Sequence, residues 1–92
     1  MQNFPNPFHP TTTIRFAVPE RSAVRLSVFT VLGQEVATLV DGEVGPGYQS
    51  VEWKAVDKNG RVLAPGIYLY RLQAKSLKTG VFHQVRKMVL LK

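Results

Sequence analysis

Apolar and polar residues alternate with a period of two over most of this chain, which is the pattern of half-buried β-strands. The clearest example is TTTIRFAV, residues 11–18, where Ile14, Phe16 and Val18 fall on one face. Similar patterns predict further strands over residues 23–31, 35–40, 48–55, 67–75 and 81–92, and a brief one within 61–66. Helical periodicity is weak throughout. Its one candidate, LGQEVATLV, is short and flanked by glycines, so we assign it to a strand.

Turn signals separate these strands roughly every ten residues, a spacing typical of an all-β sandwich of about seven antiparallel strands. Gly33 offers a positive-φ turn position, DGEVGPG at 41–47 reads as a loop, and Gly66 follows Pro65 in another turn. DKNG predicts a tight turn in which Asn59 and Gly60 suit positive φ and the Asp57 side chain bonds back to the backbone. The chain therefore predicts a small β-sandwich.

The opening NFPNPFHPTTT has three prolines, which fix φ and favour extended backbone before each of them. We therefore expect residues 1–11 to be a proline-rich lead-in at the end of a linker, and residues 12–92 to form the sandwich. Phe4 and Phe8 are expected to pin this lead-in onto the surface of the domain. Met1 is expected to be an artificial start, with a larger module preceding it in the parent protein.

The net charge of +6 has one source, because residues 71–92 contain six basic side chains and no acid. Such a segment suits an anionic partner, or protects a strand edge from unwanted pairing. The absence of cysteine excludes disulfides and thiolate metal sites. No apolar run approaches the ~20 residues that span a bilayer, so no direct membrane insertion is expected. Only Phe82 accompanies the basic residues, which argues against nucleic-acid binding.

The sequence offers no catalytic constellation. His9 and His83 are the only histidines, and both are expected on the surface; most of the carboxylates fall in loops or at outward strand positions. DKNG resembles the start of a calcium loop, but Arg61 and Leu63 stand where oxygen ligands are needed. We therefore expect neither enzymatic activity nor a metal or other cofactor.

The aromatic residues allow two interpretations. Tyr48, Trp53, Tyr68 and Tyr70 are candidates for a sugar-stacking platform. The favoured alternative places Phe16 and Trp53 in the core and gives Tyr68 a corner role, since a tyrosine near a strand start often ties a sandwich corner through its hydroxyl.

The closing RKMVLLK is apolar on both faces of a strand. Either Met88 and Leu90 or Val89 and Leu91 fill the core, and the pattern does not decide which. The other pair needs a second cover, either the lead-in or a partner. As the last strand it is a candidate sheet edge open to strand addition, with Arg86, Lys87 and Lys92 deterring casual pairing.

Four segments in order resemble a known family. NFPNPFHPTTTIRFAVPE, VFTVLGQEVATLVDG, VEWKAVDKNGRVLAPGIYLYRLQA and KMVLLK together resemble the C-terminal sorting domain of type IX secretion cargo, the Por secretion tail. DKNGRVLAPGIYLYRL is also similar to the immunoglobulin-like domain of flagellar hook-capping proteins. The matching positions are the lead-in residues Asn6, Pro7, Phe8 and Pro10, the turn at Leu32 and Gly33, and the terminal motif Lys87, Met88, Val89, Leu90, Leu91 and Lys92. His9 departs from the family, which usually has asparagine there.

The resemblance implies an immunoglobulin-like sandwich that follows an exported cargo. It implies recognition of the last strand by the type IX translocon and its shuttle proteins, and cleavage by a sortase-like protease at the cell surface. The expected localisation is the periplasm in transit and then the outer-membrane surface or the medium. The alternatives are an adhesion or carbohydrate-binding module of a secreted enzyme, and a structural spacer in a surface or flagellar assembly.

Overall fold

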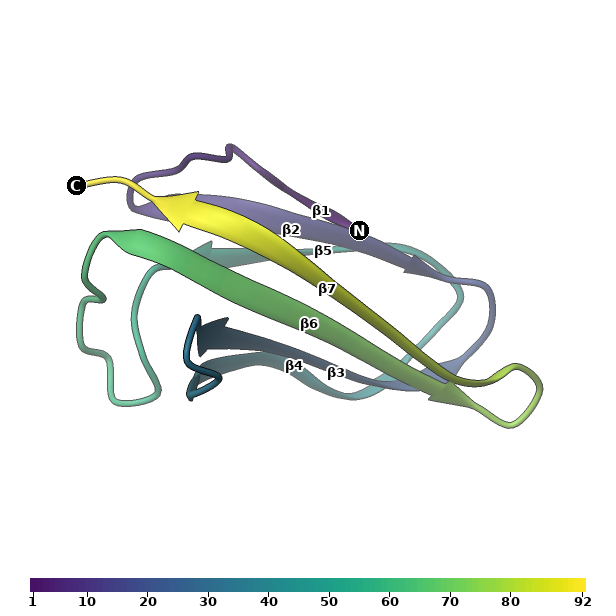
Figure 1. Ribbon diagram of the computed structural model, residues 1–92. Helices are drawn as coiled ribbons and strands as arrows, with labels where there is room; N and C mark the ends of the chain where they lie inside the picture. Colours follow the sequence, from purple (N-terminus) through teal and green to yellow (C-terminus); the bar gives the residue numbers. More distant parts are fainter.

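The computed structural model describes residues 1–92 and contains seven strands in two antiparallel sheets (Figure 1). One sheet has the order β1-β2-β5 and the other β4-β3-β6-β7. The predicted all-β antiparallel sandwich of about seven strands is confirmed, and the arrangement is immunoglobulin-like. No helix is long and apolar enough to cross a membrane. The strands are β1 Gln2–Phe4, β2 Thr11–Val18, β3 Ser22–Thr30, β4 Glu35–Val44, β5 Gly47–Lys54, β6 Gly66–Ser76 and β7 Gly80–Leu90.

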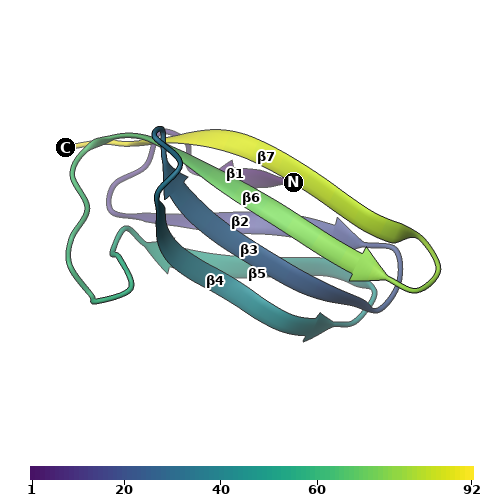
Figure 2. The same cartoon turned by 60° about the horizontal axis from the view of Figure 1, so that its bottom comes forward.

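The core lies between the two sheets, as the two layers of Figure 2 make visible. On β2, Ile14, Phe16 and Val18 are buried at every second position, and β3 contributes Leu26 and Val28 in the same way. Because successive side chains of a strand point to opposite faces, the alternation in the sequence places these residues inside. The spacing of the apolar residues therefore determines which face of each strand packs into the core.

Strand β4 is longer than the sequence predicts. The segment 41–47 reads as a loop by composition, but Asp41–Val44 continue β4, and Gly47 opens β5. Pairing with β3, which extends to Ser22 opposite Val44, supplies the backbone partners that hold this polar and glycine-rich segment extended. The loop prediction is wrong here because tertiary pairing outweighs local composition.

The brief strand predicted within 61–66 does not form. A single bridge joins Val56 to Val62, and the segment around it is a turn. Its backbone is fixed instead by separate bonds to its neighbours: Lys58 N–H donates to Val36 O (2.9 Å) and Leu63 N–H to Ala55 O (3.1 Å).

The lead-in is part of the sandwich rather than a linker. Gln2–Phe4 form β1, which pairs with Thr13–Arg15 of β2, and Phe8 is 1% exposed within the core. The expectation that Phe4 packs on the domain is wrong, because this side chain is 78% exposed. Proline content predicted extended backbone, but gave no sign that the extended segment completes a sheet.

Candidate functional site

The terminal strand turns one apolar pair inward. Met88 and Leu90 are buried, whereas Val89 is half-buried and Leu91 is exposed. The alternative left open by the sequence is therefore decided in favour of Met88 and Leu90 as core residues. Both basic residues of the terminal motif, Lys87 and Lys92, are exposed.

The lead-in covers the outer edge of this terminal segment. Phe8 N–H donates to Val89 O (2.9 Å), and Leu91 N–H donates to Phe8 O (2.8 Å), which forms a parallel bridge between Phe8 and Leu90. The Phe8 ring packs inside the core at 6.0 Å from the ring of Trp53. The lead-in therefore covers the edge of the terminal strand, while the Phe8 ring lies on its core side. The expected second cover over the outward pair is incomplete, since Leu91 is 48% exposed.

Two polar side chains extend this contact. The Asn6 amide donates to Lys87 O (3.3 Å) and accepts from Val89 N–H (3.0 Å), so it occupies the place of a strand peptide group. The His9 ring lies with Nδ1 3.2 Å from Leu91 O. Asn6, Phe8 and His9 are called the lead-in clamp below. Of the other lead-in positions, Pro10 accepts a bond from Ala55 N–H (3.0 Å), while Pro7 is exposed.

A buried polar cluster beside the clamp was missed by sequence reasoning. Asn3 donates to Thr12 Oγ1 (3.2 Å) and accepts from the Tyr70 hydroxyl (3.0 Å), and Thr12 donates to Pro5 O (2.9 Å). Burial raises the pKa of Tyr70. The prediction that Tyr70 belongs to a sugar-stacking platform is therefore wrong, because this side chain is buried. The available signal was the alternation of β6, which puts Tyr68, Tyr70 and Leu72 on one face.

The remaining predicted aromatics lie as follows. Phe16 and Trp53 are in the core, and the indole N–H of Trp53 donates to Val56 O (3.3 Å). The Tyr68 hydroxyl donates to Ala64 O (2.6 Å), four residues earlier, and burial raises the pKa of this tyrosine. Tyr48 alone is open to solvent, 92% exposed.

The predicted turn residues lie away from the clamp. The Asp57 carboxylate accepts from the backbone N–H of Asn59 (2.8 Å) and of Arg61 (3.0 Å), and the Arg61 bond is the larger cause of its lowered pKa. Gly60 has φ of 78°, whereas Asn59 does not have positive φ, so only the glycine uses the left-handed region there. Gly33 (φ 89°) closes the β3–β4 turn, and Gly66 opens β6.

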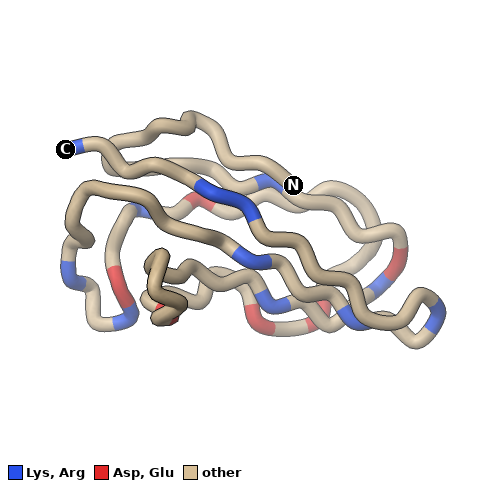
Figure 3. Tube along the Cα trace, in the orientation of Figure 1, with Lys and Arg blue, Asp and Glu red and all other residues tan.

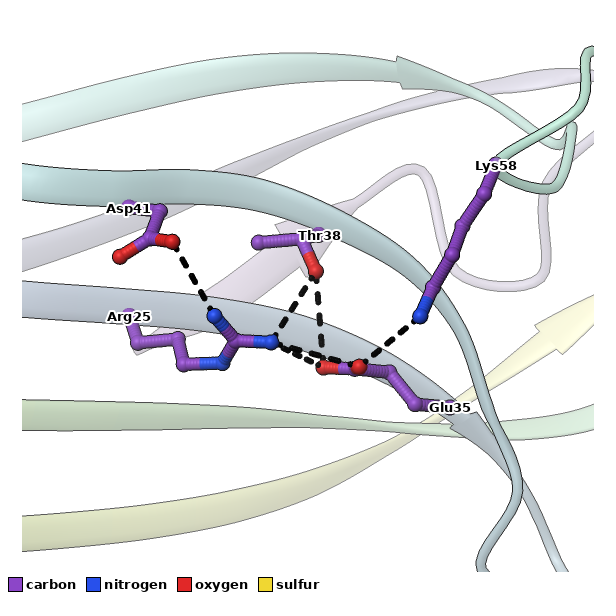
Figure 4. A network of polar contacts seen from close by, with 5 residues as sticks. All are labelled: Arg25, Glu35, Thr38, Asp41 and Lys58. Carbon is purple, nitrogen blue, oxygen red and sulfur yellow. Dashed lines mark hydrogen bonds and ion pairs between the residues drawn. The ribbon is translucent and has the colours of Figure 1, made fainter.

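An ion-pair network ties the β3–β4 hairpin to this turn (Figure 4). Arg25 bonds Glu35 (3.0 Å) and Asp41 (3.1 Å), and Lys58 reaches Glu35 at 3.1 Å. The pKa of Glu35 is lowered to about 2 by the nearby Ser27 hydroxyl and then by Lys58 and Arg25. Because Ser27 Oγ has no hydrogen-bond partner in the structure, the two cations are the partners that the geometry supports. The network is structural and brings no acid or base near the terminal strand.

The two edges of the larger sheet, at β4 and at β7, differ in charge. The ion pairs of the chain involve Arg21, Arg25 and Lys58, and none involves a residue of 71–92. Figure 3 shows the consequence: β6 and β7 carry basic residues with no acidic one among them, while the acidic residues of this sheet lie on β4. No group of three or more His, Asp or Glu side chains is placed to hold a metal ion.

Solved structures with this fold include FlgD, PorU and PorZ. FlgD from P. aeruginosa matches with a TM-score of 0.68 and 21% identity, over 86% of this chain and 61% of its own. Dimeric latent PorU from Porphyromonas gingivalis matches with a TM-score of 0.77 and 21% identity, over 98% of this chain and 9% of its own. PorZ, a surface component of the type-IX secretion system of the same species, matches with a TM-score of 0.61 and 16% identity, over 99% of this chain and 11% of its own.

These likenesses establish the fold, and this chain spans less than two thirds of each of the three proteins. No curated protein matches the sequence. The sequence model of one family, the FlgD Ig-like domain, matches residues 8–78, from the clamp residue Phe8 to the β6–β7 turn. Because that match covers more than half of the chain, the protein belongs to the FlgD Ig-like domain family.

Proposed function

We propose that the chain is a sorting module that directs an attached cargo through the type IX translocon to the cell surface. One observation carries the proposal: the terminal strand is held in fixed geometry by the lead-in clamp while its polar end stays accessible. Asn6 and Phe8 hold the outer edge at Val89, and Lys87, Leu91 and Lys92 remain exposed. A rigidly presented motif is recognised at lower entropic cost than a disordered tail.

The structural neighbours add support of a general kind. PorZ, described as a surface component of type-IX secretion, has this fold over nearly all of the chain. On this proposal the partners are the translocon and its shuttle proteins, then a sortase-like protease at the surface. The module acts by being recognised and performs no catalysis itself.

The core position of Met88 and Leu90 determines how the proposal is tested. Deleting the last five residues would remove two buried side chains, so a loss of export would follow from unfolding alone. A cleaner experiment fuses residues 1–92 behind an exported reporter in a bacterium with type IX secretion and reverses the exposed charges with Lys87→Glu and Lys92→Glu. We expect reporter activity to move from the surface to the periplasm while the melting temperature stays unchanged.

The matched control reverses two basic residues at the opposite end of the same sheet, Lys75→Glu and Lys78→Glu. These residues belong to the same unpaired basic set but lie beside the β6–β7 turn. Surface display should survive in this control. If the Lys87 and Lys92 variant is displayed normally, or if it and the control lose display equally, the translocon does not recognise the terminal motif.

A second candidate is an assembly module of a surface or flagellar structure, favoured by the match to the FlgD Ig-like family. That match ends at Lys78, before β7, so it leaves the terminal strand out. The two candidates differ when residues are appended after Lys92. A terminal sorting signal should lose function, whereas an assembly module should tolerate the extension. The carbohydrate-binding alternative lacks its platform, since Trp53 and Tyr70 are buried.

A further inference from the structure

The first half of β7 has an unpaired outer edge. β7 is the last strand of its sheet, and its outward peptide groups can be identified from the clamp, where Val89 and Leu91 bond to the lead-in. The register with β6 continues without a shift, so every second residue towards the start of the strand has the same orientation. Val81, His83 and Val85 therefore present N–H and C=O groups that no other strand receives.

The lead-in does not reach this half-edge. In Figures 1 and 2 the N-terminus lies about midway along β7, and the remainder of the strand continues alone to the β6–β7 turn. Neighbouring side chains are apolar and open to solvent: Val81, Phe82 and Val85 are 53%, 52% and 54% exposed. Natural sheets normally shorten, charge or cover such an edge, so an apolar, unpaired half-strand is unusual.

A groove follows the edge on the inner side. A cavity of about 330 Å³ is lined by Val18, Pro19 and Phe82, among others, where β2 ends and β7 begins. A second, of about 400 Å³, lies further along the same flank and contains both Arg15 and Arg86. The two share Ala17, so an apolar section leads into a dibasic one. Neither arginine forms an ion pair.

We propose that the half-edge Val81–Val85 of β7 accepts, by strand addition, an extended acidic peptide segment of another protein. On the face that lies over the groove, this segment has apolar residues at one end and acidic residues at the other. Its backbone would pair with the outward groups of Val81, His83 and Val85, and its apolar side chains would fill the groove beside Phe82. Its carboxylates would meet Arg15 and Arg86, the kind of pair that Arg forms bidentately. This inference stands apart from the sorting proposal, which concerns residues 87–92.

Charge and hydrogen bonding favour this occupant over two others. A second copy of the chain would set two segments 71–92 side by side, each with six basic residues and no acid, which is repulsive. An anionic lipid surface would satisfy the charges but offers no N–H donors for the outward carbonyl groups of an edge strand. An acidic peptide supplies both.

The test uses the 92-residue chain and a capped synthetic peptide that has Thr at every second position and, between the Thr residues, Val in one half and Glu in the other. Amide hydrogen exchange by NMR should slow at Val81, His83 and Val85 by about tenfold when free peptide is about ten times its Kd. Two control peptides separate the contributions: one replaces Glu by Lys, and the other carries an N-methyl group on every backbone amide. Neither should protect these three amides.

Variants of the chain locate the site. His83→Pro removes one outward N–H and leaves the β6–β7 bonds in place, since proline is tolerated at a strand edge. Arg86→Glu tests the charge without touching the edge backbone. Both should weaken peptide binding at least tenfold, whereas Lys54→Glu, on the exposed edge strand β5, should leave it unchanged.

Several results would overturn the inference. Equal binding of the Lys peptide would remove the charge argument, and equal binding of the N-methylated peptide would remove strand addition. Protection confined to β4, the opposite edge of the sheet, would place the acceptor elsewhere. Protection of the β7 amides by self-association without peptide would identify a second copy as the occupant. Binding to phosphatidylglycerol vesicles without binding to the acidic peptide would identify a lipid surface.

Discussion

At the scale of single residues, Asn6 is the side chain that most directly joins the two ends of the chain. Its amide donates to Lys87 O and accepts from Val89 N–H. Both bonds are exposed, so water replaces them when the side chain is removed, and the expected cost of Asn6→Ala is about 1 kcal/mol. Urea unfolding measures it. Asn59→Ala is the matched control because that side chain forms no hydrogen bond, and an equal loss in the control would contradict the assigned role.

The two core-facing tyrosines of β6 are expected to respond unequally to loss of the hydroxyl. Tyr68→Phe removes one bond to Ala64 O, with an expected cost of about 1 kcal/mol. Tyr70→Phe leaves the buried Asn3 Oδ1 without its donor, and an unsatisfied buried acceptor costs about 1–3 kcal/mol. Denaturant unfolding of both variants should therefore rank Tyr70→Phe as the more destabilising, and the reverse order would contradict the buried cluster.

At the scale of elements, the Glu35 network makes the β3–β4 hairpin sensitive to acid. The pKa of Glu35 is lowered from 4.5 to about 2 in the folded chain. A carboxyl group with a lowered pKa stabilises the fold above its unfolded pKa, and this contribution disappears as the pH falls from about 4.5 towards about 2. The Glu35→Gln variant should be less stable at pH 7 by about 1 kcal/mol, since the network is partly exposed.

The pH profile separates this effect from simple loss of packing. Thermal unfolding from pH 7 to pH 2 should show the difference between parent and Glu35→Gln shrinking as the acid protonates Glu35. Glu20→Gln, on an unpaired carboxylate, provides the control and should not change the profile. A constant difference between Glu35→Gln and parent across this range would show that the charge of Glu35 contributes nothing.

The elements also show how far sequence reasoning reaches. Alternation identified strands β2 to β7 and, except in the closing RKMVLLK, their inner faces, because a period of two acts through the same geometry in every sheet. The Asp57 turn was predictable because its bonds are local. The β1 strand and the extension of β4 were not, since their backbone partners lie on β2 and β3 and no local pattern records a pairing. The lead-in clamp joins residues more than eighty positions apart.

For the whole molecule, the lead-in closes the sandwich, because a segment expected to be a linker supplies a strand, a polar clamp and a core ring. We expect Phe8 to contribute most of the stability that the lead-in adds, because its ring is buried against Trp53, whereas Phe4 is exposed. Phe→Ala at a buried site costs about 3–5 kcal/mol, a large part of the 5–15 kcal/mol that typically stabilises a whole domain.

Phe8→Ala should therefore lower the melting temperature by more than about 10 °C, while Phe4→Ala should change stability by less than about 0.5 kcal/mol. The comparison isolates burial, since the two residues are of one type and lie four positions apart in the same segment. Circular dichroism melts of the two variants measure it. If the two variants were equally stable, residues 1–11 would merely rest on a domain that is complete without them. The expected difference would mean that the sandwich exists only with its first residues in place, so that cutting the chain between Phe8 and Thr11 would loosen the terminal strand as well.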